Sequence, residues 1–157
     1  PVEKNAIREA ALRLGAKKVY VEEEPKVAAV GAGMDISKPS GNMVIDIGGG
    51  TTDIAVLSLG GIVNSASLKV AGNTFDEAII DYIKDKYKLL VGERTAEEVK
   101  LTIGSVYNGE EGNKMEIKGR DLSKGLPKIV EVGESEIESA LEPLAMKIVK
   151  KAKINVI

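Results

Sequence analysis

The sequence contains neither cysteine nor histidine among its 157 residues. Without a thiolate or an imidazole, the chain lacks the usual ligands of a zinc site and has no disulfide, no cysteine nucleophile and no serine–histidine pair. Any chemistry must therefore come from carboxylates, hydroxyls, lysines, backbone amides or a bound hard cation. These absences exclude several large classes of enzyme before any motif is considered.

An excess of charge of one sign is also missing. The 22 Lys and Arg residues nearly balance the 24 Asp and Glu residues, which leaves a formal net charge of −2. Non-specific nucleic-acid binding needs a basic field, so we expect no nucleic acid among the partners. The sequence has no apolar run of about 18 residues and no signal-peptide layout at its start, so we expect a cytoplasmic protein.

The composition that is present fits one compact unit, or one unit with a small added lobe. Hydrophobic residues make up 43% of the sequence and charged residues 29%, a balance that provides enough apolar surface for a core. The first residue is Pro1 rather than Met, and a helical pattern follows almost at once. We therefore expect the sequence to be a fragment of a longer protein.

Hydrophobic periodicity in the first half of the chain predicts alternating helix and strand. The apolar spacing predicts a helix over residues 4–14, a strand over 17–23 and a second helix from Glu24, whose first turn contains a proline. Three β-branched runs separated by glycine turns then predict an antiparallel meander. These runs cover residues 43–47, 54–59 and 62–70.

The second half of the chain predicts a mixture of helices and short strands. A helical stripe begins near Asn73, which is a favourable N-cap residue. Capping-box patterns, in which Thr or Ser precedes Glu by three positions, predict further helices that begin near Thr95 and Ser135. Short strands are predicted over residues 115–118 and 126–132.

The segment that carries chemistry is 46–53, Asp-Ile-Gly-Gly-Gly-Thr-Thr-Asp, between two predicted strands. The consecutive glycines Gly48, Gly49 and Gly50 let the backbone turn tightly and present its N–H groups to an anion such as a phosphate. The segment is no Walker loop, because no Gly-Lys-Ser/Thr follows, and no Rossmann fingerprint, because the glycines lead into a strand. It predicts a phosphate-binding loop of another type.

The residues that flank the glycines support this interpretation. Asp46 ends a predicted strand and is placed to hold a magnesium ion, directly or through its waters, while Thr51 and Thr52 add hydroxyl donors beside the loop. The alternative is a hairpin turn that binds no ligand. Such a turn needs only two glycine-like positions, so three glycines between two aspartates and two threonines favour the phosphate loop.

The segment DIGGGTTD resembles the second phosphate loop of the ATPase superfamily that contains actin, sugar kinases and heat-shock chaperones. Four longer stretches narrow the resemblance: GNMVIDIGGGTTDIAVLSLGGIV, EEPKVAAVG, GERTAEEVK and GRDLSKGLPK. Together these stretches are similar to the MreB/Mbl family of bacterial actins, in order and over essentially the whole chain.

This resemblance implies an α/β fold, the second of the two actin-like ATPase domains. A ribonuclease-H-like lobe with a mixed sheet and flanking helices is expected from residues 1–72 together with 134–157. Residues 73–133 would form a smaller α+β outer lobe inserted into it. In this family Mg-ATP lies in the cleft between two domains.

The resemblance also implies roles for single residues. Asp46 matches the metal-associated aspartate, and the backbone of 48–50 with Thr51 matches the phosphate-binding loop. Glu24 matches the carboxylate that positions the attacking water. From its spacing alone, Glu24 is equally well explained as a helix-start carboxylate favoured by the helix dipole.

The resemblance makes three further residues candidates for the nucleotide site. The stretch GERTAEEVK is similar to the family segment that lies against the adenosine, which makes Glu97 and Lys100 candidate ribose or adenine contacts. A solvated helix face with an i, i+3 charge pair is the alternative for these two residues. Gly72, where the chain enters the insert, matches a residue beside the hinge. The family usually has an acidic residue at the position of Thr102.

The function implied is a cytoskeletal ATPase that polymerises with itself into filaments controlling rod cell shape and cell-wall synthesis. The intact protein would hydrolyse ATP with magnesium, and its partners would include the membrane and cell-wall synthesis proteins. The first phosphate loop and a later glycine-rich segment of the family are absent from this sequence, so these 157 residues alone are expected to be inactive and to bind ATP weakly at most.

Other functions fit the same loop. The ATPase domain of a heat-shock-type chaperone is the main alternative, and GERTAEEVK and GRDLSKGLPK argue for the bacterial actins instead. A sugar kinase would need an acceptor pocket with a catalytic base, for which the sequence offers no support. A structural module without nucleotide is disfavoured by the three glycines.

Overall fold

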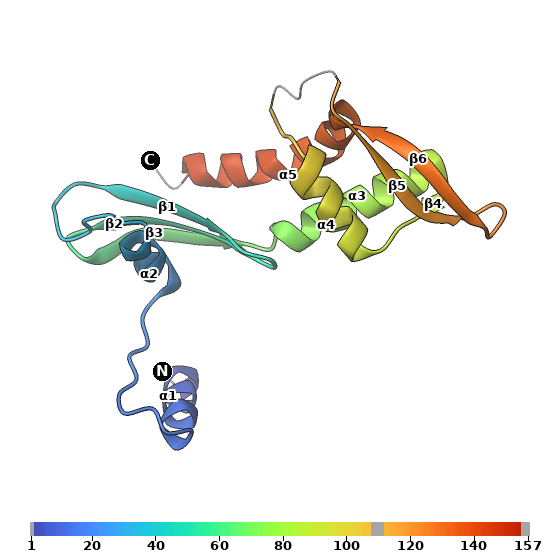
Figure 1. Ribbon diagram of the computed structural model, residues 1–157. Helices are drawn as coiled ribbons and strands as arrows, with labels where there is room; N and C mark the ends of the chain where they lie inside the picture. Colours follow the sequence, from blue (N-terminus) through green and yellow to red (C-terminus); the bar gives the residue numbers. More distant parts are fainter. Residues whose placement is uncertain (1, 108–111, 155–157) are drawn as a thin grey trace.

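The computed structural model describes residues 2–107 and 112–154. The elements in the first half are α1 (Val2–Arg13), α2 (Glu24–Gly31), β1 (Asn42–Ile47), β2 (Thr52–Ser58) and β3 (Gly61–Leu68). Those in the second half are α3 (Gly72–Tyr87), β4 (Leu89–Leu90), α4 (Glu93–Ile103), β5 (Lys114–Asp121), β6 (Pro127–Gly133) and α5 (Glu134–Ile154). In Figure 1 the sheet β1–β2–β3 with α2 lies at one side, α3, α4 and β4–β6 lie at the other, and α1 stands apart.

The first sheet is the antiparallel meander that the glycine-separated runs predict. Its strand order is β1-β2-β3, so the central strand β2 is hydrogen-bonded on both edges. Ile54, Ala55 and Leu57 of β2 are fully buried. The register places Asp46 of β1 directly opposite Asp53 of β2, at the end of the sheet where the glycine loop connects the two strands.

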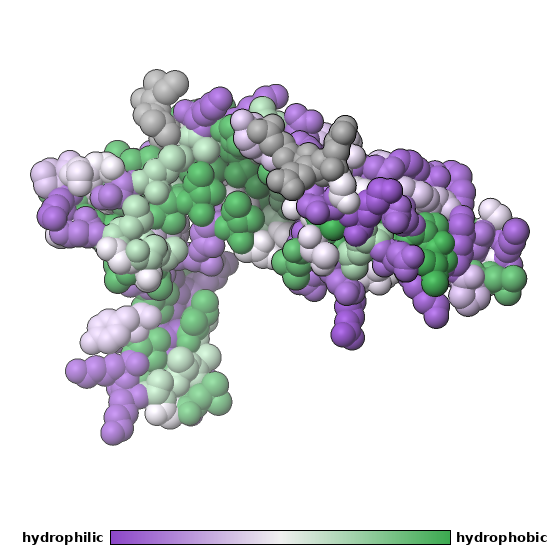
Figure 2. All heavy atoms as spheres, turned by 45° about the horizontal axis from the view of Figure 1, so that its top comes forward, coloured by the Kyte–Doolittle hydropathy of each residue, from purple (hydrophilic) through white to green (hydrophobic). Residues whose placement is uncertain are grey.

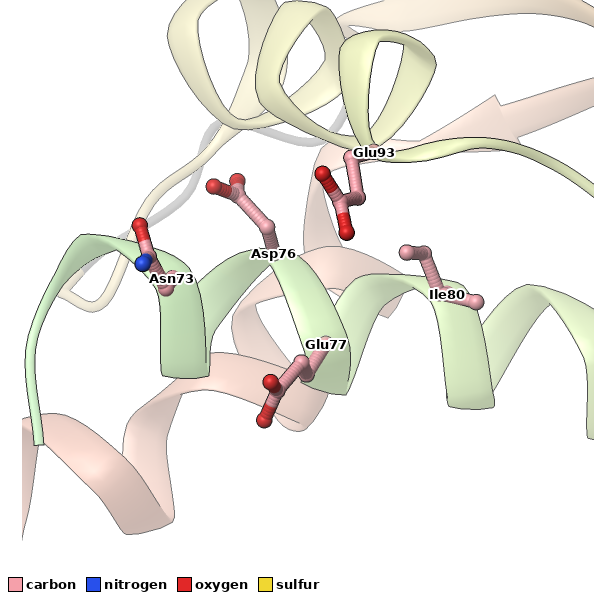
Figure 3. A pocket seen from close by; sticks show the side chains of 5 residues that line it. All are labelled: Asn73, Asp76, Glu77, Ile80 and Glu93. Carbon is pink, nitrogen blue, oxygen red and sulfur yellow. The ribbon is translucent and has the colours of Figure 1, made fainter. Parts of the chain in front are cut away.

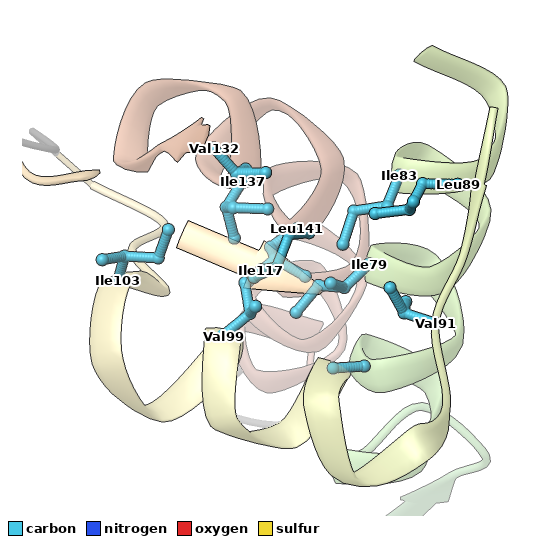
Figure 4. Packing of buried hydrophobic residues seen from close by; sticks show 11 residues of the cluster. Ile79, Ile83, Leu89, Val91, Val99, Ile103, Ile117, Val132, Ile137 and Leu141 are labelled. Atoms are coloured by element: carbon cyan, nitrogen blue, oxygen red, sulfur yellow. The ribbon is translucent and has the colours of Figure 1, made fainter. Parts of the chain in front are cut away.

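The part of the chain from α3 to α5 contains the main hydrophobic core (Figure 4). α3, α4 and the beginning of α5 pack on one face of the sheet β4-β5-β6 and contribute apolar side chains to one cluster. Its members are Ile79, Ile83, Leu89, Val91, Ala96, Val99, Ile103, Ile117, Val132, Ile137 and Leu141. The amphipathic spacing of α3 and α4 determines which of their side chains enter this core.

Residues 17–23, predicted as a strand, are not one: they run without regular structure between α1 and α2. A strand needs a hydrogen-bonded neighbour, and neither of the sheets in the described residues includes this segment. The alternation of Val19 and Val21 with charge therefore has no sheet to join here. Likewise, the apolar residues of α1 stay exposed, with Ile7 62% and Leu12 42% accessible.

Helix starts also differ from the predicted caps. Asn73 lies inside α3, whose N-cap is Ala71, and Thr95 lies inside α4, whose N-cap is Gly92. Neither N-cap makes a side-chain capping bond. In α5, Ser135 also lies inside the helix, and the Glu136 carboxylate accepts a hydrogen bond from the Gly133 amide at 3.3 Å. The predicted capping residues therefore do not begin these helices.

The helix α5 bears on the predicted division into lobes. Ile137 and Leu141, in its first turns, belong to the core of α3, α4, β5 and β6. The assignment of 134–157 to the ribonuclease-H-like lobe stays a prediction, and its last residues, like Pro1, lie outside the described part of the chain.

The surface over the first sheet differs in polarity from the surface over the part of the chain from α3 to α5. In Figure 2, apolar side chains gather over the half that contains the first sheet and over α1, whereas polar side chains dominate over the other half. Ile45, Ile47 and Val63 of the first sheet are between 43% and 68% exposed. Among the described residues, no helix combines the length and apolar character needed to cross a membrane.

Candidate functional site

The loop between β1 and β2 is built from the three glycines. The Gly48 amide donates to the Thr51 carbonyl at 2.9 Å, which closes the turn. Among the described residues, the amides of Gly49 and Gly50 donate to no acceptor, so both are available to an external anion. A Cβ atom at Gly50 would meet nothing within 4 Å, which indicates open space beside this part of the backbone. The loop therefore has the donors and the access that a phosphate requires.

The loop rests on the N-terminus of α3. The Gly72 amide donates to the Gly48 carbonyl at 3.0 Å, and the Asn73 amide donates to the Gly49 carbonyl at 2.8 Å. The first amides of a helix have no partner within the helix, so these loop carbonyls take the place of a capping side chain. The glycine loop and the first turn of α3 consequently form one hydrogen-bonded unit.

Lys100 of α4 joins this unit from a different element. Its Nζ lies 2.9 Å from Oδ2 and 2.8 Å from Oδ1 of Asp76, and 3.3 Å from the Gly72 carbonyl oxygen. The Lys100 and Asp76 side chains are only 23% and 15% exposed. An ion pair shielded to this degree is screened less by solvent and salt than a pair on the surface. The candidate adenosine contact Lys100 is thus fixed against the helix that supports the loop.

The two threonines take different positions. Thr52 is fully buried, and its hydroxyl donates to the Val70 carbonyl at 2.7 Å, which ties β2 to the segment after β3. Thr51 is exposed, and its hydroxyl donates to Asp53 Oδ2 at 3.3 Å. Of the pair, Thr51 therefore offers the more accessible hydroxyl beside the loop.

Asp46 lies half-buried at the end of β1, opposite Asp53. Within the described residues, no group of three or more acidic side chains could by itself hold a metal ion. Magnesium does not need such a group, because it commonly takes one or two carboxylates and completes its shell with waters and phosphate oxygens. The donor set here, carboxylates next to a phosphate-type loop, fits magnesium that arrives with a phosphate ligand.

Glu24 and Glu97 are exposed, and among the described residues neither is joined to the glycine loop by a hydrogen bond or an ion pair. Glu24 is the first residue of α2, directly before Pro25. Glu97 lines a shallow hollow of about 370 Å³ on α4, whose lining residues are Arg94, Glu97, Glu98, Leu101 and Thr102. Hydrogen bonds thus join the loop, Gly72 and Lys100 into one network, and among the described residues Glu24 and Glu97 take no part in it.

A second, more enclosed hollow of about 180 Å³ lies between α3 and α4 (Figure 3). It is lined by Asn73, Asp76, Glu77, Ile80 and Glu93. Sequence reasoning missed Asn73 and Asp76 as parts of the site. A helical stripe predicts the buried face of α3, but Asp76 meets Lys100 from 24 positions away, and no local pattern signals such a contact.

This chain is similar to known proteins over nearly its whole length. A family model described as "MreB/Mbl protein" matches residues 1–156. The cell shape-determining protein Mbl of Bacillus cereus is 60% identical over 152 residues, which are 97% of this chain and 46% of that protein. The cell shape-determining protein MreB of Escherichia coli is 50% identical over 144 residues, 91% of this chain and 42% of that protein. This chain therefore spans somewhat less than half the length of these relatives.

Solved structures show the same likeness. The crystal structure of MreB5 of Spiroplasma citri bound to ADP matches with a TM-score of 0.93 and 44% identity, over 99% of this chain and 47% of that one. A chain of the MamK double helical filament matches with a TM-score of 0.74 and 25% identity, over 98% of this chain and 45% of that one. The fold is accordingly the α/β fold of actin-like proteins, as the sequence predicted.

Proposed function

Since the chain belongs to the MreB/Mbl protein family, we propose that it is part of a bacterial actin-like cytoskeletal ATPase and holds part of its nucleotide site. The observation that carries the proposal is the loop from Gly48 to Thr51, with two amides available to an anion and its carbonyls docked on α3. Bound ADP in the structural relative MreB5 of Spiroplasma citri supports a nucleotide as the ligand.

In this proposal different residues of the chain contact different parts of the nucleotide. The amides of Gly49 and Gly50, with the Thr51 hydroxyl, bind the phosphates, and Thr52 supports the loop from within the sheet. Glu97 and Lys100, on α4, would contact the ribose or the adenine. Gly72 lies between these two groups and allows loop and helix to approach closely, because a Cβ there would lie 3.3 Å from the Gly48 carbonyl oxygen.

Magnesium would be held at Asp46, through waters or directly. When bound, it neutralises negative charge on the phosphates. Asp46 needs no further protein ligand for this role, since phosphate oxygens and waters complete the coordination.

Hydrolysis would place water in line with the γ-phosphoryl group. Glu24, the first residue of α2, is the proposed group that accepts a hydrogen bond from this water and orients it. The loop amides would stabilise the charge that develops on the phosphoryl oxygens. ADP and inorganic phosphate would be the products.

The full-length protein would assemble with copies of itself. The MamK filament is a double-helical assembly of a protein with the same fold, which supports self-association as a property of the fold. ATP would favour a closed arrangement of the two domains that contact it, and closure would set the geometry of the subunit contacts. The protein would be cytoplasmic and would associate with the inner surface of the membrane and with cell-wall synthesis proteins. Its filaments would control rod cell shape.

The test is high-speed pelleting and electron microscopy of the full-length protein, with and without Mg-ATP, beside an Asp46→Ala variant. We expect nucleotide-dependent filaments that disappear in Asp46→Ala and persist in Asp81→Ala, which removes an exposed aspartate from α3. A protein that binds ATP but stays monomeric would contradict the cytoskeletal part of the proposal and favour a chaperone-type ATPase.

A further inference from the structure

We propose that Asp76 is a positioning residue of the nucleotide site, which holds the Lys100 ammonium against the joint between the glycine loop and α3. This inference rests on the proposed function, in which Lys100 contacts the nucleotide. It adds a residue that acts through Lys100 and touches no nucleotide itself.

The first step is the geometry of the ion pair. Asp76 offers both carboxylate oxygens to Lys100 Nζ, at 2.9 Å and 2.8 Å. Asp76 Oδ1 is buried and, among the described residues, has no hydrogen-bond partner, so the ammonium charge at 2.8 Å is what compensates it. The long and flexible lysine side chain is thereby held in one place, which removes rotamer freedom before any ligand binds.

The second step connects this pair to the loop. Lys100 Nζ also donates to the Gly72 carbonyl at 3.3 Å, while the Gly72 amide donates to the Gly48 carbonyl. One residue, Gly72, therefore receives the lysine on one side and supports the phosphate loop on the other. Asp76 stands one helical turn after Gly72 and determines where that lysine lies.

The third step is the direction of the side chains. In Figure 3, Asp76 points from α3 towards α4, whereas the neighbouring Glu77 points away from α4. Glu77 lines the same hollow, carries the same charge and is exposed. It thus provides a matched control: neutralising Glu77 changes the local charge equally and leaves the Lys100 contact in place.

Substitution of Asp76 by Asn keeps the side-chain size and removes the charge that holds Lys100. The ammonium then regains alternative rotamers, and a bound nucleotide has to order it again. We expect an approximately tenfold weaker affinity for nucleotide, which lies within the usual range of coupling for side chains in contact.

The experiment measures Mg-ADP affinity by titration calorimetry on the full-length protein, well below its unfolding temperature. Four variants are compared with wild type: Asp76→Asn, Lys100→Met, the double variant and Glu77→Gln. We expect Asp76→Asn to lose about tenfold in the Lys100 background and almost nothing in the Lys100→Met background, because a positioning residue has no effect once its target is gone. Glu77→Gln should bind like wild type.

Equal affinity of Asp76→Asn and wild type would overturn the inference, as would the same loss in both Lys100 backgrounds, which would indicate a general structural effect. Wild-type protein without affinity for Mg-ADP would instead overturn the proposed function itself, and this inference with it. If Asp76→Asn fails to fold, Asp76→Glu takes its place. A longer carboxylate still pairs with Lys100, so an intermediate affinity is expected, and unchanged affinity in the Lys100→Met background remains the decisive result.

Discussion

The Gly72 amide donates to the Gly48 carbonyl across 3.0 Å, and this bond joins the glycine loop to the first turn of α3. The two backbones approach so closely that a Cβ at Gly72 would lie 3.3 Å from the Gly48 oxygen, 3.6 Å from Lys100 Nζ and 3.7 Å from Gly49 Cα. A side chain at this position would therefore require the loop or the helix to shift by a few tenths of an ångström. The site depends on contacts between segments more than on any single side chain.

Gly72→Ala should destabilise the fold by about 1 kcal/mol, because the added methyl group forces the loop and the helix apart. Ala has the higher helix propensity, so a purely local effect would have the opposite sign. Urea denaturation of the full-length protein measures the change. Unchanged or increased stability would show that the loop adapts without cost.

Gly50→Ala should act in the opposite way. A Cβ at Gly50 meets nothing within 4 Å, so stability should change by less than about 0.5 kcal/mol. The methyl group would, however, stand where the phosphate approaches the backbone, and we expect Mg-ATP affinity to fall at least about tenfold. Calorimetry and thermal unfolding on the same sample separate the two effects, and unaltered affinity would argue against phosphate binding at this loop.

Asp53→Asn should stabilise the first sheet by a few tenths of a kcal/mol, since like charges directly opposite each other in an antiparallel pair repel. Asp53 faces Asp46 in this register. The gain should shrink when magnesium and nucleotide are present, because a cation at Asp46 would offset the repulsion. Thermal unfolding with and without Mg-ATP tests this, and destabilisation in the absence of ligand would contradict it.

A separate network joins α3 to α5. The Glu136 carboxylate accepts a hydrogen bond from Tyr87 Oη at 2.6 Å and one from Lys86 Nζ. Partial burial would raise the pKa of Glu136, but the bonds from Lys86, Tyr87 and the Gly133 amide outweigh it and lower the pKa below 4.5. A lowered pKa means that the ionised form stabilises the folded state.

Glu136→Gln should therefore cost about 1 kcal/mol of unfolding free energy at neutral pH. The contribution of Glu136 is complete above pH 4.5 and disappears as the pH falls through its folded pKa, so wild type and variant should converge in acid. Chemical denaturation across this range is the measurement. Glu142→Gln, at an exposed position of α5, is the control and should show no such convergence.

Tyr87 makes the stability of the same network depend on pH in the alkaline range. Burial, followed by its bond to Glu136, raises the pKa of Tyr87 from 10.0 to about 12. A raised pKa stabilises the fold below pH 10.0, and this contribution is lost as the pH rises towards 12. Tyr87→Phe should flatten the loss of stability over this interval, and ultraviolet titration should show one late phenolate in wild type that the variant lacks.

Local patterns allowed much of this molecule to be predicted. The β1–β2–β3 meander follows from β-branched runs separated by glycines, and the helix α2 follows from a proline in its first turn. The actin-like fold and the family followed from the resemblance of four stretches, spread along the chain, to the MreB/Mbl family. The signals for the meander and for α2 lie within short windows, where steric preference and hydrophobic spacing act directly.

Other features needed the tertiary structure. Residues 17–23 alternate like a strand but have no neighbouring strand among the described residues, because sheet formation requires a partner that the segment cannot supply. The start of α3 is capped by carbonyls of the glycine loop, more than 20 residues earlier in the chain, so no capping side chain marks it.

The sequence by itself determined where the glycine loop lies and which glycines build it, because residues without a Cβ permit a tight turn between two strands. Only the tertiary structure decided what the loop rests on and where Lys100 points. Asp76 lies in α3 and Lys100 in α4, and these two helices pack against each other. Ion pairs between distant segments depend on such packing, which short-range patterns do not encode.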